Sequence, residues 1–146
     1  MKLLSILALV GLFLVSQNAF SRDSVQGFSI TDALAHEKAQ SLLGDQVEFY
    51  FGDERPSGVS REFGEFKTNK KTNAFGKSDK VACQWAFLSA MVALRDRALN
   101  EGGNAVVNIR SNYKSNLTSS PSEFRCGAGA MVAGVALVGT VVTITK

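Results

Sequence analysis

The chain has 146 residues, and 16 Lys and Arg against 13 Asp and Glu give it a formal net charge of +3 at pH 7. This excess is too small to indicate a nucleic-acid-binding protein, because such proteins carry a strongly basic face. Two cysteines and one histidine are too few ligands for a tetrahedral metal site. We therefore expect no nucleic acid, metal or cofactor as a ligand.

The N-terminal residues are typical of a cleavable export signal. A lysine precedes an uncharged apolar run, Leu3–Val15, and small residues stand at the −3 and −1 positions of a cleavage site after Ser21. The run is too short to span a bilayer, and we expect no membrane span elsewhere. The sequence predicts that cleavage near Ser21-Arg22 removes residues 1–21. Residues 22–146 are then expected to be a single periplasmic or secreted domain.

The first part of the exported chain is expected to be a loose start, Arg22–Gly27, followed by a short helix. Thr31 or Asp32 can cap this helix by accepting hydrogen bonds from its free N–H groups, and the helix is expected to end near Gly44. On such a helix we expect His36 to be exposed or capping rather than catalytic.

Two stretches then alternate between apolar and polar residues, as strands do. They are "QVEFYFG", residues 46–52, and "VSREFGEF", residues 59–66, with Pro56 and Gly58 stopping regular structure between them. Because the connection is short, we expect the two strands to form an antiparallel hairpin.

A basic, asparagine-rich segment follows and is expected to be a loop. Its run "EFKTNKKTNAFGKSDK" carries five lysines: Lys67, Lys70, Lys71, Lys77 and Lys80. Exposed lysines bind anions weakly, and salt screens the attraction. The segment is therefore either a binding loop for an anionic polymer of the cell envelope or a solvated turn.

The best-defined element is a long helix that Ser78 or Asp79 can cap and that Gly102-Gly103 can stop. It shows two apolar stripes well over a right angle apart: Val81, Trp85, Leu88, Val92 and Leu99, and Cys83, Phe87, Met91, Leu94 and Ala98. Such a helix needs cover on two sides. We expect the sheet on one side and, on the other, either the N-terminal segment or another subunit of a homo-oligomer. Trp85 is expected to pack in the core.

The C-terminal part favours strands. Residues 104–113 form one, residues 114–122 are a polar loop, and residues 123–144 favour two strands joined or bent at Gly139. The order of elements predicts an α+β fold, in which one main helix packs on a mostly antiparallel sheet, with a short N-terminal helix.

Both cysteines, Cys83 and Cys126, lie in the exported part. In an oxidising compartment, two thiols in a small domain favour a disulfide, which the chain-entropy model credits with about 4 kcal/mol of stabilisation. A reactive or redox-switching pair and metal ligation are the alternatives. The glycines from Gly127 to Gly134 are not a phosphate loop, because no lysine follows them until Lys146. We expect a protein without enzymatic activity.

A family resemblance covers about Val47 to Thr145. The helix and strand "ACQWAFLSAMVALRDRALNEGGNAVVNI" and the ending "CGAGAMVAGVALVG" resemble small exported bacterial proteins of the YbjQ-like and RcsF-like group. With "FKTNKKTNAFGKSD" included, the chain is similar to an exported proteobacterial family often labelled "excinuclease ATPase subunit". An excinuclease ATPase needs phosphate loops, zinc-holding cysteine pairs and cytosolic nucleotide, so we reject that activity for this chain.

The resemblance implies a compact α+β domain. YbjQ-like proteins form rings, and RcsF-like proteins are disulfide-bearing sensors of envelope stress that contact other proteins. Cys83 and Cys126 look similar to a helix-to-strand disulfide of the RcsF-like type.

Together these observations predict a non-enzymatic periplasmic interaction or sensory domain, stabilised by one disulfide. Its expected partners are envelope proteins or anionic envelope polymers, and it is expected to form a homo-oligomer if the second helix stripe needs a subunit to cover it. The alternative is a small envelope thiol or redox enzyme that uses Cys83 or Cys126. A cysteine near a helix start can have a lowered thiolate pKa, which is the ground for that alternative.

Overall fold

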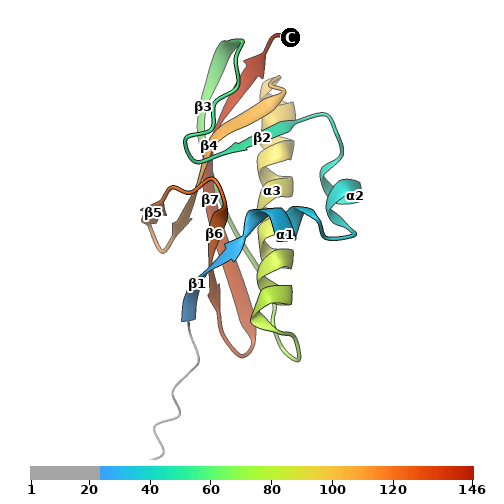
Figure 1. The fold of residues 1–146 in the computed structure, drawn as a ribbon, viewed down its shortest axis with the longest axis vertical. Coiled ribbons are helices and arrows are strands. Elements are labelled where there is room, and N and C mark those ends of the chain that lie inside the picture. Colours follow the sequence, from blue (N-terminus) through green and yellow to red (C-terminus); the bar gives the residue numbers. More distant parts are fainter. Residues whose placement is uncertain (1–23) are drawn as a thin grey trace, which may run out of the picture.

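The computed structural model describes residues 24–146, so the predicted export signal and its cleavage site lie outside the described residues. The strands are β1 (Ser24–Ser29), β2 (Glu48–Phe51), β3 (Val59–Asn73), β4 (Ala105–Tyr113), β5 (Asn116–Thr118), β6 (Glu123–Ala128) and β7 (Val132–Ile144). The helices are α1 (Ile30–Leu34), α2 (Ala39–Leu43) and α3 (Asp79–Glu101). As predicted, the fold is α+β, with one main helix on a mostly antiparallel sheet (Figure 1).

Strand β7 is the centre of the sheet. One of its edges pairs with β3 along the full length, and the other edge pairs first with β6 and then with β4. β1 extends the sheet beyond β6, β5 adds to the end of β4, and β2 lies parallel to β4. The glycines and alanines of β6 and β7 pair closely, as at Gly127 with Gly134.

The predicted hairpin of β2 with β3 is wrong, because the two strands lie on opposite sides of the β4–β7 pair. The connection Gly52–Gly58 can extend to about 20 Å, enough to cross the roughly 14 Å that separates strands three positions apart. Gly58 has φ +81°, and a Cβ there would lie 2.4 Å from the carbonyl oxygen of Thr145, so the chain turns tightly against the end of the sheet. A short connection therefore did not mean neighbouring strands.

The N-terminal part also differs from expectation. The predicted loose start is strand β1, whose residues from Ser24 onward pair with β6. The single predicted helix is two short helices, and between them the backbone N–H of Lys38 donates to Nδ1 of His36 at 3.1 Å. His36 is thus a half-buried residue of a turn between helices, where its ring accepts a backbone hydrogen bond, and it is neither exposed nor the cap of a helix, since the cap residues here are Ala35 and Lys38.

Two strand limits were also misplaced. The two C-terminal strands exist, but their turn lies between Ala128 and Val132, and Gly139 stands inside β7. There a Cβ would lie 2.5 Å from Cγ1 of Val106, so the glycine allows close packing rather than a bend. The predicted basic loop is strand as far as Asn73, because β7 pairs with it throughout.

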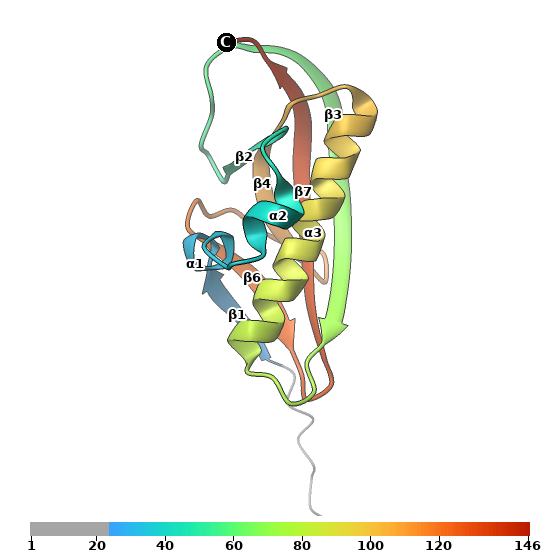
Figure 2. The same cartoon turned by 90° about the vertical axis from the view of Figure 1, so that its right-hand side faces the viewer.

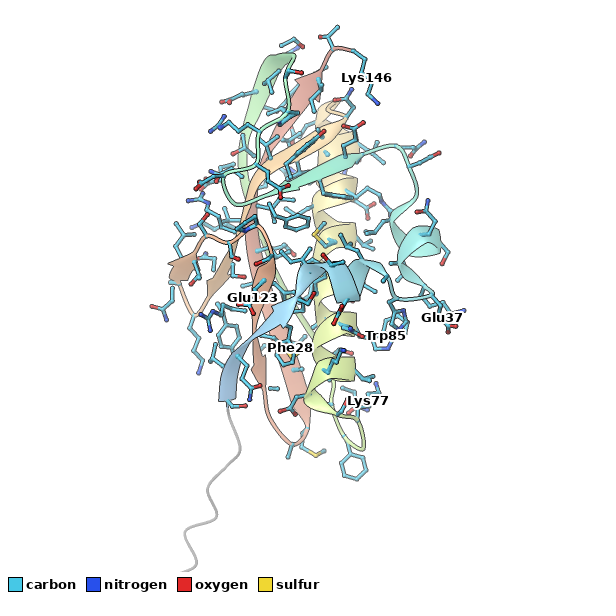
Figure 3. The ribbon with its side chains drawn as sticks, in the orientation of Figure 1. Phe28, Glu37, Lys77, Trp85, Glu123 and Lys146 are labelled. Atoms are coloured by element: carbon cyan, nitrogen blue, oxygen red, sulfur yellow. A yellow bond between two sulfur atoms is a disulfide. The ribbon has the colours of Figure 1, made fainter. Side chains whose placement is uncertain are left out.

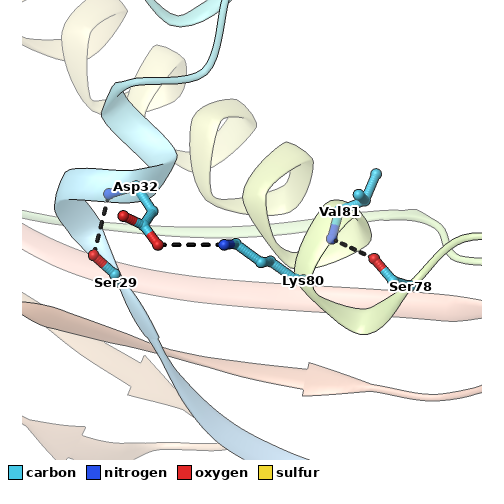
Figure 4. A network of polar contacts seen from close by, with 5 residues as sticks. All are labelled: Ser29, Asp32, Ser78, Lys80 and Val81. Carbon is cyan, nitrogen blue, oxygen red and sulfur yellow. Dashed lines mark hydrogen bonds and ion pairs between the residues drawn. The ribbon is translucent and has the colours of Figure 1, made fainter.

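Helix α3 begins and ends where the sequence predicts. The Oγ of Ser78 accepts a hydrogen bond from the N–H of Val81, and Gly102 adopts a left-handed conformation after the last turn. Figure 4 shows this cap beside that of α1, where Ser29 accepts from Asp32, and the ion pair of 3.3 Å between Asp32 and Lys80 that links the two helices.

One stripe of α3 is covered fully within the chain and the other only in its middle, because Val81 and Leu99 at its two ends are exposed. The sheet covers the stripe of Cys83, while α1 and α2 pack on the other side, where Leu88 is fully buried (Figure 2). Trp85 is half-buried and touches the ring of His36, with centroids 4.9 Å apart, so its predicted place in the core is only partly correct. The N-terminal segment therefore covers the middle of the second stripe, and the homo-oligomer stays a prediction.

A disulfide joins α3 to the sheet, as predicted. Cys83 and Cys126 are bonded, and both are fully buried. Beside them the rings of Phe87 and Phe124 stack at 4.2 Å, so core packing joins the first half of α3 to β6. Among residues 24–146, no helix is long and apolar enough to cross a membrane.

Candidate functional site

The outer edge of β3 is the longest unpaired strand edge in the described part of the chain. From Glu65 to Asn73 this strand keeps nine consecutive pairs with β7, and its register shifts are confined to the earlier part, before Gly64. Within residues 24–146 no strand pairs with its other side, and Figure 2 shows β3 at the margin of the sheet. We call Glu65–Asn73 the free edge. About half of its N–H and C=O groups point away from β7.

Side chains of the free edge alternate between the two faces of the sheet. Paired residues share a face, and Thr68 pairs with Leu137, which is part of the core under α3. The helix side therefore receives Phe66, Thr68, Lys70 and Thr72. The opposite, open face receives Glu65, Lys67, Asn69, Lys71 and Asn73.

A groove of about 350 Å³ separates the free edge from α3. Its lining includes Phe66, Thr68 and Lys70 from β3, and Leu94 and Arg97 from α3. The guanidinium of Arg97 lies 4.0 Å from the centroid of the Phe66 ring, a cation–π contact that fixes one wall. The Oγ1 of Thr68 is buried and has no hydrogen-bond partner, a state that costs about 1–3 kcal/mol. The groove thus combines apolar walls, cations and an unsatisfied hydroxyl.

On the open face, a second hollow of about 280 Å³ lies between β3 and the end of β4. Lys67, Asn69, Asn112 and Lys114 contribute to its lining. The residues provide ammonium and amide groups, which donate hydrogen bonds to anions or carbonyl groups.

The charge of the free edge is almost wholly positive. Its one carboxylate, Glu65, forms an ion pair of 2.7 Å with Arg110, which reaches it across β7. Lys67, Lys70 and Lys71 are all exposed. Within the free edge a ligand therefore meets three lysines and one carboxylate that Arg110 already pairs, while the exposed Glu62 lies earlier on β3.

The other two predicted lysines lie elsewhere. The Nζ of Lys77 donates to the backbone oxygen of Asn73 at 3.0 Å in the turn before α3, and Lys80 pairs with Asp32. The five lysines thus do not form one binding loop: three belong to a strand, on both of its faces, and two to the start of the helix. Anion binding by them stays a prediction.

Sequence reasoning missed two residues that complete the site. Arg97 comes from α3 and lines the groove, and Arg110 comes from β4 and pairs with Glu65. The strand itself had a detectable signal, since Phe66, Thr68 and Thr72 favour strands and alternate with polar residues.

Other sites offer less chemistry. The disulfide sulfurs are sealed in the core, and the described residues contain no group of three side chains able to hold a metal. Far from the free edge, the Lys146 ammonium hydrogen-bonds to Glu48 and lowers the pKa of that carboxyl, and Glu48 in turn raises the pKa of Tyr50. These exposed groups fasten the C-terminal residue to β2 (Figure 3 labels Lys146).

Comparison with models of known protein families, with curated proteins and with solved structures found no match. The geometry of the free edge is therefore the strongest basis for inferring a function.

Proposed function

We propose that the protein is a non-enzymatic interaction or sensory domain of the periplasm, and that it binds an extended, acidic polypeptide segment along the free edge of β3. The observation that carries this proposal is an unpaired, regular edge of nine residues whose uncompensated charge is positive. An extended segment joins such an edge as an additional strand, using backbone hydrogen bonds for affinity and side-chain pockets for selectivity.

The pattern along β3 supports this interpretation. Exposed edges invite unwanted pairing, and proteins protect them with bulges and charges. The first part of β3 has two register shifts, whereas the free edge has none and relies on lysines alone. Those lysines repel a second copy of β3 but attract an acidic strand, so they select the partner.

The groove beside α3 can select the side chains on one face of the bound segment. Every second side chain of an added strand would face α3, where Phe66 and Leu94 provide apolar contact and the Oγ1 of Thr68 lacks a partner. The intervening side chains would face Lys67 and Lys71 on the open side. The favoured ligand thus alternates small or polar groups with carboxylates.

A peptide-binding measurement tests the proposal. The exported, oxidised protein is titrated with an acidic nine-residue peptide and with a basic peptide of the same length. We expect Lys70→Glu/Lys71→Glu to weaken binding of the acidic peptide by about tenfold or more, since each reversal replaces attraction with repulsion. The matched control is Lys38→Glu/Arg55→Glu, which reverses two exposed charges away from β3 and should bind like the wild type.

Two further peptides test the strand itself. N-methylation of alternate backbone nitrogens removes the donors on one side of the peptide only. We expect one of the two methylation patterns to abolish binding and the other to preserve it. Equal binding of the two N-methylated peptides would refute strand addition. So would equal effects of the two charge-reversed variants on binding of the acidic peptide. In that case an anionic polysaccharide, which offers charge without a row of backbone groups, becomes the better ligand.

The alternative of a thiol or redox enzyme, which rests on the place of Cys83 near a helix start, is less favoured by the geometry. Cys83 and Cys126 are bonded to each other with no exposed surface, whereas a reactive thiol needs access and an activating neighbour.

A further inference from the structure

Four large apolar side chains are exposed at one end of the molecule, next to the last residue of the free edge. They are Phe75 at 68% exposure, Met131 at 60%, Val132 at 48% and Val81 at 42%. They come from the turn between β3 and α3, with the first turn of that helix, and from the turn between β6 and β7. We call them the apolar tip. Scattered single exposed residues are ordinary, but four at the same end, with Phe75 and Met131 on two adjoining turns, indicate a binding surface.

The two turns are held together and held in shape. The N–H of Ala74 donates to the backbone oxygen of Met131 at 2.9 Å, and β3 and β7 pair up to Asn73 and Val132. The Oδ1 of Asn73 accepts from the N–H of Phe75 at 2.9 Å, which fixes the turn that carries the phenylalanine ring outward. Figures 1 and 2 both place these turns side by side at the same end.

An excess of positive charge lies beside the apolar tip. Residues 71–81 contain three lysines and one aspartate, residues 127–134 contain no charged side chain, and of the three lysines Lys80 pairs with Asp32 from α1. Figure 3 shows Lys77 at this end, opposite the end that carries Lys146. A lysine beside apolar side chains can lay its methylene groups along them while its ammonium stays in water.

We propose that the apolar tip inserts into the interface of a membrane that contains anionic lipids. Two adjoining turns with outward apolar residues and neighbouring lysines suit the interface of an anionic membrane. Membrane binding grows with buried apolar area and with attraction to anionic headgroups. A stable protein interface buries roughly 800 Å² on each partner, more than four side chains on two narrow turns supply. The tip begins where the free edge ends, because Val132 pairs with Asn73, so a peptide bound to the earlier residues of the free edge would lie beside the membrane.

Vesicle flotation of the exported, oxidised protein tests this inference. One set of vesicles contains phosphatidylglycerol, and the other contains only zwitterionic phosphatidylcholine. We expect the wild type to bind the anionic vesicles. The variant Phe75→Ser/Met131→Ser should bind them about tenfold or more weakly, because each substitution removes apolar area that the membrane would otherwise bury. Lys77→Glu should weaken binding to the anionic vesicles only.

The matched control is Val59→Ser/Leu117→Ser, which removes two apolar side chains that are 38% and 55% exposed on other strands. It should bind anionic vesicles like the wild type. The inference is overturned if the wild type does not float with anionic vesicles, or if this control loses as much binding as the tip variant. Peptide binding by the tip variant should be unchanged, so failure of this inference and failure of the proposed function give different results.

Discussion

Gly139 and Gly134 both stand in β7, yet the structure needs only the first of them to be glycine. A Cβ at Gly139 would lie 2.5 Å from Cγ1 of Val106 and 3.3 Å from Cγ1 of Ile109, and both of these side chains are buried. At Gly134 the nearest heavy atom is 3.5 Å away, an ordinary contact. The two sites have no left-handed backbone, so space alone separates them.

We therefore predict that Gly139→Ala lowers the free energy of unfolding by about 1–3 kcal/mol, the usual range for overpacking a core. Gly134→Ala should stay within about 0.5 kcal/mol of the wild type. Urea denaturation of the two variants measures the difference. Equal stabilities would mean that Val106 can move aside and that the close approach is not required.

At the scale of elements, α3 was predictable because its limits depend on local chemistry. A serine can accept hydrogen bonds from the first free N–H groups, and a glycine can adopt the left-handed conformation that ends a helix. Strand β3 was harder, since lysine and asparagine do not favour strands in isolation. Its second half is a strand because β7 provides a partner for nine consecutive residues.

The cap of α3 gives a prediction at this scale. Ser78→Ala removes the acceptor for the N–H of Val81 and should lower the free energy of unfolding by about 1 kcal/mol. Ser89→Ala is the control within the same helix, because the Ser89 hydroxyl donates only to the Trp85 carbonyl one turn earlier. That hydroxyl bond does not stabilise a helix interior, so Ser89→Ala should be neutral or slightly stabilising. Thermal or urea unfolding compares the two, and a larger loss for Ser89→Ala would contradict the assigned cap.

At the scale of the whole molecule, the disulfide connects the two layers of the fold. It joins residues 43 positions apart, and its ends lie in α3 and β6, on opposite sides of the core. Because α3 is also covered by α1 and α2, the bridge fixes the helix between the sheet and the N-terminal segment. Its buried position indicates a structural role.

Removal of the bridge should therefore be costly to stability and harmless to the peptide surface. The variant Cys83→Ala/Cys126→Ala should lose about 2–4 kcal/mol of unfolding free energy, the usual range for a disulfide, with the chain-entropy model giving its upper end for this loop length. In the wild type, thiol-alkylating reagents should label neither cysteine until a reductant and a denaturant are both present. Labelling of the folded protein without reductant would instead favour the thiol-enzyme alternative.

The sequence by itself determined the features that depend on neighbouring residues. These are the start and end of α3, the alternation of β2 and the beginning of β3, and, through the expected compartment, the pairing of two cysteines. It also identified three of the lysines that now mark the free edge, although as parts of a loop.

Only the tertiary structure decided which strands are neighbours. It placed β2 against β4 and β3 against β7, and it left one side of β3 unpaired. Strand pairing depends on contacts between residues far apart in the chain, and no local pattern in "EFKTNKKTN" specifies its partner. For the same reason the groove with Arg97 and the apolar tip shared by two distant turns could not be read from the sequence, since each is assembled from segments that meet only when the chain folds.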